Sequence, residues 1–268
     1  MNAQQPQQQA AAASGPAAAP APADGQHLLD VIDMAGGYGD VDIVSGATLH
    51  VAAGEIVTIA GTNGAGKSTL IKAVMGLLPR LSGTLRFDGT DLRSLAVEDR
   101  IRVGISYVPQ VQNVFGDLTV MENLQVVEHV ADPRARIAQM LEMFPVLGTR
   151  RRTQASNLSG GERQQLAFAR ALMPSPRMVL LDEPSAALSP ALTQQVFDEV
   201  RRLPQLGVAV LMVEQRARQA LAFSDRGYIL DQGRIVLSDT GPNLLANQEM
   251  ADLYIGRGHD QTRQGVPA

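Results

Sequence analysis

The most regular pattern in the chain is a set of short apolar runs separated by stretches with helical spacing. Three runs, Ile56–Ala60, Met178–Leu181 and Val208–Val213, are typical of strands buried on both faces. One face of a helix after the first run carries Leu70, Ile71, Val74, Met75 and Leu78. Another helix is predicted from about Pro190. This alternation of strand and helix predicts parallel pairing through right-handed crossovers and therefore an α/β fold.

The two ends of the folded region have a different pattern. Residues 28–57 predict short strands, and we expect Gly36-Gly37 and Gly54-Glu55 to mark turns between them. Arg86–Thr90 (RFDGT) and Asp231–Gly233 (DQG) have the composition of hairpin turns. These segments predict antiparallel strands beside the parallel core.

A third pattern, between about Leu118 and Leu147, predicts helical structure. Apolar residues there follow i, i+3, i+4, i+7 spacing: Ile137, Met140, Leu141 and Phe144. Such a stripe is typical of a helix packed on a core, and docking of a partner is the alternative. Arg150–Arg152 beyond it is interpreted as a solvated helix end or, alternatively, as a contact for lipid headgroups.

Composition then limits the classes of function. The chain has 268 residues, 45% of them hydrophobic, which is enough for a sizeable core. A net charge of −4 gives no general attraction to nucleic acid or anionic lipid. The absence of cysteine excludes disulfides and thiolate metal sites. The sequence has neither the apolar run of about 18 residues that a spanning helix needs nor the pattern of a secretory signal.

The termini differ from the rest of the chain. Residues 1–25 are rich in Gln, Ala and Pro and are predicted to be disordered, because they have almost no large apolar side chain to bury. A role as a tether or partner-binding segment is the alternative. Residues 257–268 have a similar character, so one folded domain is predicted over residues 26–256.

The segment after the first apolar run carries the most specific chemical motif. It reads GTNGAGKST and comprises Gly61, Thr62, Asn63, Gly64, Ala65, Gly66, Lys67, Ser68 and Thr69. It matches G-x-x-x-x-G-K-[ST], the phosphate loop, in which glycines let backbone N–H groups converge on a phosphate at a helix N-terminus. Lys67 is expected to reach the β- and γ-phosphates, and the Ser68 hydroxyl to bind Mg²⁺.

Two carboxylates follow the second apolar run. Asp182 closes this run, where a carboxylate that holds Mg²⁺ is expected. Glu183 is the next residue, and because neighbours on a strand point in opposite directions we expect it to have a different role. That role is to align or deprotonate the attacking water. A solvated strand end is the alternative for such a pair.

A second glycine-containing turn opens a helix about ninety residues after the phosphate loop. It comprises Ser159, Gly160, Gly161 and Glu162. One nucleotide is already surrounded by the first loop, so this turn is redundant within one chain. If two chains pair head to tail, the Ser159 hydroxyl and the Gly161 N–H can contact the γ-phosphate held by the partner chain.

Together, these motifs resemble those of the ATP-binding subunits of ABC transporters. LSGGERQ looks like the family's signature motif, GTNGAGKST like Walker A, MVLLDEP like Walker B and Tyr107–Gln110 like the Q-loop. Tyr38 is similar to the aromatic residue that stacks on adenine, and an ordinary strand residue is the alternative. The resemblance covers about Leu28–Gly256. It implies a P-loop NTPase fold with a RecA-like core, an antiparallel β subdomain and an α-helical subdomain at about residues 112–170.

The resemblance also implies a mechanism and partners. ATP and Mg²⁺ are the expected cofactors, with Ser68, Asp182 and Gln110 as the metal contacts. Transmembrane permease subunits, a second ATPase subunit (a heterodimer or a homodimer) and indirectly an external solute-binding protein are the expected partners, at the cytoplasmic face of the membrane. No nucleic acid is expected. Val111–Asn123, which contains Val114, Phe115 and Leu118, is interpreted as a groove for a permease helix or as ordinary packing between lobes.

Longer stretches narrow the resemblance to the smaller ATPase subunit of branched-chain amino acid importers, whose relatives serve urea and short-chain amide uptake. These stretches include LMVEQRARQAL, DRGYILDQGRIVLSDTG and LLANQEMADLYIG. Gln215 stands where the general pattern has the switch histidine, and Ser189 where the D-loop has aspartate. Both departures look usual for this subfamily. The Q-loop reads VPQ where many such subunits have VPEG, so the solute stays open. Gln215 is expected to bond a γ-phosphate oxygen without titrating near neutral pH.

Three other hypotheses compete with the assignment to a transporter ATPase subunit. An ATPase of DNA repair or chromosome maintenance shares these motifs, but usually has a long heptad segment or zinc module between them. A ribosome-acting ABC protein usually has two cassettes, and only one is present here. A catalytically inactive regulatory subunit is raised by Gln215 and Ser189, whereas Lys67, Asp182 and Glu183 argue against it.

Overall fold

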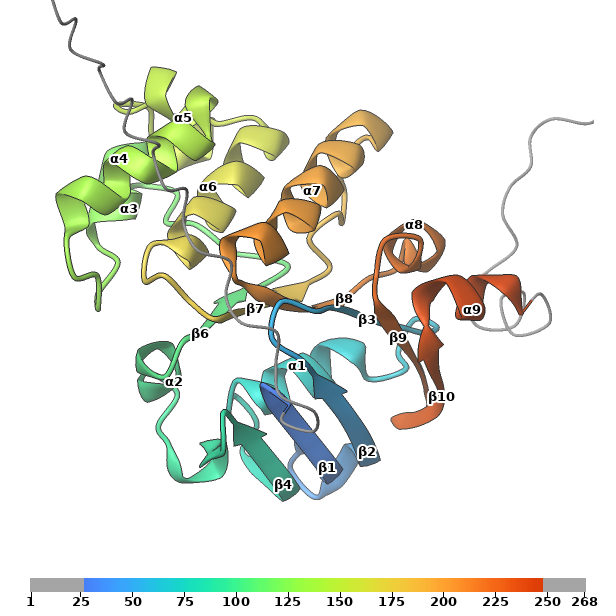
Figure 1. Ribbon diagram of the computed structural model, residues 1–268. Helices are drawn as coiled ribbons and strands as arrows, with labels where there is room; N and C mark the ends of the chain where they lie inside the picture. The colour runs from blue at the N-terminus through green and yellow to red at the C-terminus, as the bar shows by residue number, and fades with distance from the viewer. Residues whose placement is uncertain (1–26, 248–268) are drawn as a thin grey trace, which may run out of the picture.

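A six-stranded sheet lies at the centre of the molecule, with strand order β10-β9-β3-β8-β7-β6 (Figure 1). Its strands are β3 (Ile56–Ala60), β6 (Ile105–Val108), β7 (Met178–Asp182), β8 (Ala209–Val213), β9 (Arg226–Asp231) and β10 (Arg234–Thr240). The structure is a computed structural model that describes residues 27–247. The predicted loose tails, residues 1–25 and 257–268, lie outside this range.

Pairing within this sheet confirms the predicted parallel core. The β3–β8, β7–β8 and β6–β7 pairs are all parallel, and every residue of β3, β7 and β8 is buried. The β9–β10 pair is an antiparallel hairpin closed at Gln232-Gly233, as predicted. β9 also pairs with β3 in parallel, so the hairpin extends the core sheet.

A second sheet, in the order β2-β1-β4-β5, is antiparallel. Its strands are β1 (Leu29–Tyr38), β2 (Val41–Val51), β4 (Arg80–Phe87) and β5 (Thr90–Asp91). The expected turn at Gly36-Gly37 is wrong, because both glycines lie inside β1. A Cβ atom at Gly37 would lie 2.0 Å from the Val41 carbonyl oxygen. This glycine therefore allows a close strand approach and does not end the strand.

Helix α1 (Lys67–Val74) packs against strands of both sheets. Its predicted apolar face is buried, although Met75 and Leu78 lie just beyond the end of the helix. Other helical segments are α2 (Asp99–Arg102), α7 (Pro190–Arg202), α8 (Ala217–Leu221), α9 (Gly241–Ala246) and the short 3-10 turns η1 (Leu92–Ser94), η2 (Ala155–Asn157) and η3 (Leu203–Leu206). In the range 27–247, no helix combines the length and apolar character needed to cross a bilayer.

A helical lobe lies on the far side of the central sheet from the antiparallel sheet (Figure 1). It contains α3 (Val120–Gln125), α4 (Pro133–Met143), α5 (Pro145–Thr149) and α6 (Gly160–Leu172). The predicted helical stretch from about Leu118 to Leu147 is thus broken into three helices, with residues 126–132 outside them. Pro133 and Pro145 each begin a new helix, because proline disfavours helical backbone in the preceding residue.

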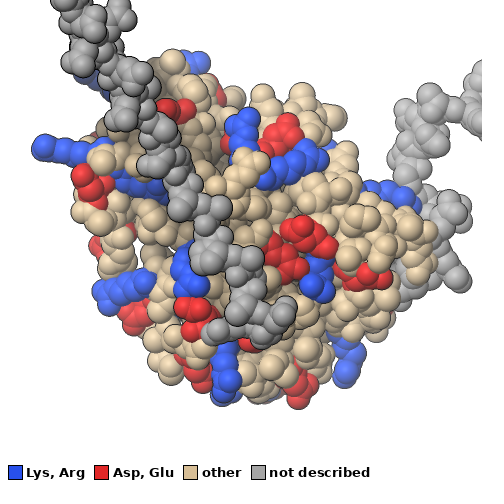
Figure 2. Space-filling model, in the orientation of Figure 1, with Lys and Arg blue, Asp and Glu red and all other residues tan. Residues whose placement is uncertain are grey.

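The apolar stripe on α4 belongs to a core. Ile137, Met140 and Phe144 are buried in a cluster shared with α6 and α7, and Leu141 packs against it. This burial supports the core interpretation of the stripe. At the surface, Lys and Arg side chains are interspersed with Asp and Glu on the face shown in Figure 2. The exact limits of the helical subdomain stay a prediction.

Candidate functional site

The segment Gly61–Ser68 connects β3 to α1, which is the context that a phosphate loop requires. Gly66 caps α1 in the left-handed region, with φ of 99°, and no side chain accepts a hydrogen bond from the first turn. The Lys67 Nζ donates to the carbonyl oxygens of Gly61 and Thr62, 3.0 Å away in each case. The loop therefore curls around its own lysine, and the helix N-terminus keeps its backbone donors available.

Glycine is required at the first position of this loop. A Cβ atom at Gly61 would lie 2.1 Å from the Leu230 carbonyl oxygen in β9. The central sheet thus fixes where the loop begins. Burial lowers the pKa of the Lys67 amino group, and the nearby carboxylates of Glu183, Asp182 and Glu214 oppose this shift.

A cavity of about 350 Å³ opens over the loop. It is lined by Ile43, Asn63, Gly64, Gly66, Lys67, Ser68, Thr69, Glu183 and Gln215. The structure thus brings most of the predicted loop together with two predicted residues, Glu183 and Gln215, from the loops that follow β7 and β8. The other predicted site residues do not line it: Tyr38, Gly61, Thr62, Ala65, Gln110, Ser159, Gly160, Gly161, Glu162 and Asp182. Tyr38 is 46% exposed at the end of β1, so its stacking on adenine stays a prediction.

Asp182 lies directly beneath the loop. The Ser68 hydroxyl donates to Asp182 Oδ1 at 2.7 Å, and the Tyr107 hydroxyl donates to Oδ2 at 3.2 Å. A hydroxyl and a carboxylate oxygen therefore converge at one point, and oxygen ligands of this kind suit Mg²⁺ when phosphate oxygens and waters complete its shell. The residues fit the predicted metal. Tyr107 was not predicted here, although it lies next to β7 on β6.

Glu183 has a different backbone from the one that we expected. β7 ends at Asp182, and Glu183 has φ of +48°, so the argument from strand alternation is wrong for this pair. Its N–H donates to the Val213 carbonyl oxygen at 3.0 Å, which ties it to the end of β8. An observed left-handed non-glycine residue costs conformational energy and is often found at active sites.

Two glutamines contact the Glu183 side chain. The Gln110 Nε2 donates to Glu183 Oε2 at 2.9 Å. Burial raises the pKa of the Glu183 carboxyl, with Asp182 adding to the shift, while Lys67 and a hydrogen bond from Gln215 lower it. Gln110 thus contacts the predicted water-activating group and not Asp182, and its role as a metal contact stays a prediction.

The second turn, Ser159–Glu162, begins α6 on the helical lobe. The Glu162 N–H donates to Ser159 Oγ at 3.3 Å, and the Ser159 N–H donates to Glu162 Oε2 at 2.9 Å. This arrangement is a capping box, and the S-x-x-E spacing of the sequence is typical of one. A Cβ atom at Gly161 would lie 2.6 Å from Leu192 Cδ2, so this position packs closely on α7.

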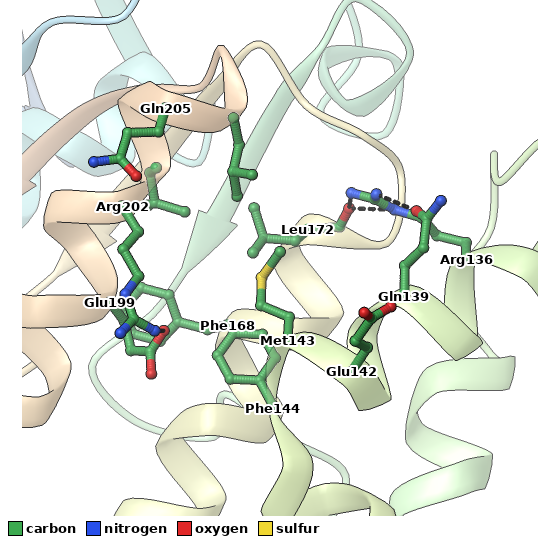
Figure 3. Close-up of a pocket in the computed structure, with 12 residues that line it drawn as sticks. Arg136, Gln139, Glu142, Met143, Phe144, Phe168, Leu172, Glu199, Arg202 and Gln205 are labelled. Atoms are coloured by element: carbon green, nitrogen blue, oxygen red, sulfur yellow. Dashed lines mark hydrogen bonds and ion pairs between the residues drawn. The ribbon is translucent and has the colours of Figure 1, made fainter. Parts of the chain in front are cut away.

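A larger cavity, of about 450 Å³, lies between α4, α6 and α7 (Figure 3). Its floor is apolar and includes Met143, Phe144, Phe168 and Leu172. Arg136 lies at its rim and donates to the Leu172 carbonyl oxygen. This cavity lacks the glycine-rich turn and convergent donors of a phosphate site, so size alone does not identify the functional site.

The comparisons with known proteins agree with this geometry. A family model described as "ABC transporter" matches residues 44–186, which contain the phosphate loop, Asp182-Glu183 and the second turn. The high-affinity branched-chain amino acid transport ATP-binding protein BraG of Pseudomonas aeruginosa is 43% identical over 82% of this chain and 95% of its own length.

The chain belongs to the ABC transporter family.

Two further matches support the assignment. The probable branched-chain amino acid transport ATP-binding protein LivF of Archaeoglobus fulgidus is 36% identical over 85% of this chain and 99% of its own. A crystal structure of a nucleotide-free ATP-binding cassette from an ABC transporter has a TM-score of 0.77 and 26% identity, over 87% of this chain and all of that one. The predicted P-loop ABC fold is confirmed. The chain is an ATP-binding subunit and an ATPase, and the comparisons do not favour the DNA-maintenance alternative.

Proposed function

We propose that this ABC subunit hydrolyses ATP to drive import of branched-chain amino acids through partner membrane subunits. The main observation in support of this proposal is the cavity that the phosphate loop, Glu183 and Gln215 line together. The names of the BraG and LivF relatives support the solute class. Urea or short-chain amides are the nearest alternatives. Because phosphoryl transfer needs mainly positioning and charge stabilisation, the cavity contains the parts that it requires.

Six polar residues in or beside the cavity have roles in this proposal. Lys67 leaves its loop carbonyl partners and donates to the β- and γ-phosphates. Glu183 aligns the attacking water and accepts its proton, a role that its raised pKa favours. Gln215 donates to a γ-phosphate oxygen. Ser68 and Asp182 hold Mg²⁺, with Gln110 beside them, and the ion supplies charge neutralisation at the phosphates.

The second turn acts across a dimer interface in this proposal. Ser159 and Gly160 are exposed on α6 and do not line the cavity of their own chain. A head-to-tail pair of ATPase subunits brings this turn to the partner's γ-phosphate, so ATP holds the two chains together. The partner is a related subunit or a second copy of this chain.

A groove of about 430 Å³ is the proposed contact for the permease, at the cytoplasmic face of the membrane. It is lined by Phe115, Val126 and Arg170, among other residues. Phe115 is 52% exposed and lies under the Arg170 guanidinium, 4.4 Å from the ring centroid. Of the three apolar residues predicted for this contact, Phe115 lines the groove, whereas Val114 and Leu118 do not; Val114 packs against the cluster that contains the α4 stripe.

The Glu183→Gln variant tests the hydrolytic role. It should bind ATP but hydrolyse it at least about a hundredfold more slowly, because it loses the group that aligns and deprotonates water. It should therefore accumulate as an ATP-bound dimer with Mg²⁺, measured by light scattering and phosphate release. Glu142→Gln, an exposed glutamate on α4, is the control. A Glu183→Gln chain that stays monomeric with ATP, Mg²⁺ and its co-purified ATPase partner would contradict the dimer mechanism.

The solute is tested with the permease and binding protein that co-purify with the chain. ATP hydrolysis by the reconstituted complex should rise when the binding protein carries leucine, isoleucine or valine. Urea and acetamide serve as the competing solutes. Stimulation by an amide alone would replace the amino acid assignment and leave the ATPase role intact.

A further inference from the structure

Glu214 is a buried acid that the mechanism above does not use. It lies between β8 and Gln215 and is 1% exposed. Burial raises the pKa of its carboxyl. A carboxylate at such a position is costly unless hydrogen bonds compensate for the lost water. Its oxygens do have such partners, and all of them lie in loops at the edge of the cavity.

The partners of Glu214 come mainly from one residue. The Ser185 N–H donates to Glu214 Oε1 at 3.0 Å, and the Ser185 hydroxyl donates to Oε2 at 2.9 Å. The Arg216 N–H adds a longer contact to Oε2, at 3.4 Å. Because two oxygens of one carboxylate bind two donors of one residue, the contact fixes orientation as well as distance.

This contact joins two loops that carry functional residues. Ser185 lies two positions after Glu183, and Glu214 directly precedes Gln215. Two further hydrogen bonds join the same parts of the chain. The Glu183 N–H donates to the Val213 carbonyl oxygen, and Arg216 Nη2 donates to the Leu188 carbonyl oxygen at 3.0 Å. Leu188 also lies against the start of α6, since a Cβ atom at Gly160 would be 3.4 Å from its Cδ2.

We propose that Glu214 is a positioning residue, which clamps the loop after Glu183 to the loop of Gln215 so that both side chains face the same phosphate position. The inference rests on the proposed ATP hydrolysis. Glu214 has no contact with the nucleotide in this proposal, since it does not line the cavity. It acts through Ser185, and its loss allows Glu183 and Gln215 to separate.

The test compares Glu214→Ala, Ser185→Ala and the double variant in the full-length chain with its ATPase partner. Glu214→Ala should lower kcat by up to about a hundredfold, because small misplacements of reacting groups have effects of that size. The KM for ATP should change little, because the phosphate loop is untouched. The double variant should be no slower than Glu214→Ala alone, since both substitutions break one interaction. Glu214→Gln, which keeps an acceptor for the Ser185 N–H, should retain most of kcat.

Ser224→Ala is the matched control. Ser224 is also buried, and its hydroxyl contacts Thr58 Oγ1 at 2.6 Å and the Ala220 carbonyl oxygen at 2.9 Å, so it takes no part in the bonds between Glu214 and Ser185. This variant should lose stability but keep kcat. The proposal is overturned if Glu214→Ala keeps wild-type kcat, if the Ser185 and Glu214 effects add independently, or if Ser224→Ala lowers kcat equally. Absence of hydrolysis by the wild-type complex would instead overturn the proposed function.

Discussion

The two glycine-containing turns, before α1 and before α6, differ in whether side chains bond the backbone N–H groups at the start of the helix. The phosphate loop ends at Gly66, and no side chain caps α1. The second turn has a complete capping box, in which Ser159 and Glu162 bond each other's backbone N–H groups. The first turn thus has donors available for a ligand, whereas in the second the capping box already bonds the Ser159 and Glu162 N–H groups.

This difference fits the two tasks that we propose for the turns. An open N-terminus, a buried lysine and a neighbouring carboxylate pair suit the proposed binding of a phosphate within one chain. A capped and exposed turn needs no ligand for its own stability and is available to contact a phosphate from outside. In the second turn, the Ser159 hydroxyl accepts a bond from the Glu162 N–H. It also bonds the Glu162 side chain, which lowers the pKa of that carboxyl, so its proton would have to turn toward a partner's phosphate.

Loss of the first turn's lysine should have the largest effect. Lys67→Ala should reduce kcat/KM for ATP by about a thousandfold, because a charged donor to the transferred phosphate is removed. Direct ATP binding and phosphate release are the measurements. The chain's other lysine, Lys72 in the last turn of α1, provides the control Lys72→Ala. If Lys67→Ala hydrolyses ATP normally, the first turn is not the phosphate site.

Removal of the second turn's hydroxyl should have an intermediate effect. Ser159→Ala should bind ATP normally and lose about a hundredfold in dimer-dependent hydrolysis. It should also lose about 1 kcal/mol of stability as a helix cap. Thr119 and Glu122 form the same capping box at α3, so Thr119→Ala should lose similar stability and keep hydrolysis. Equal loss of hydrolysis in both variants would mean that Ser159 acts only as a cap.

Substitution of Gln215, at the switch position, should have the smallest effect on hydrolysis. In the wild type, hydrolysis should fall on acidification through the Glu183 pKa, which burial raises, because the protonated acid cannot accept the water's proton. Gln215 adds no titration to that profile. Gln215→His should retain activity and add an inflection near the ordinary histidine pKa of about 6.5. An unchanged pH profile of kcat would count against contact between this residue and the phosphate.

Much of the fold was predictable because its signals are local. Fully apolar runs indicated the parallel strands, and the phosphate-loop motif required a strand before it and a helix after it. The helical lobe was less predictable. The stretch predicted as helical, from about Leu118 to Leu147, is interrupted before Pro133 and before Pro145. Gly36-Gly37 was misread because close strand approach and turning both favour glycine.

Part of the cavity lining was predictable from the sequence, but its contacts were not. The sequence indicated Glu183 and Gln215, and the structure adds that Gln110 and Gln215 contact the same carboxylate. The positions of Tyr107, Ile43 and Glu214 at the site depend on neighbours far away in the chain. Strand alternation misled the reading of Glu183, because its left-handed backbone follows from a bond to β8 that no local pattern indicates.

Burial of α1 between two sheets has a consequence for binding thermodynamics. The phosphate loop is continuous with this helix, so the packing of α1 on both sheets restrains the end of the loop that joins the helix. Amide hydrogen exchange should therefore be slow along α1 even without nucleotide. ATP then meets a loop that is already ordered, and little of its binding free energy is spent on conformational entropy.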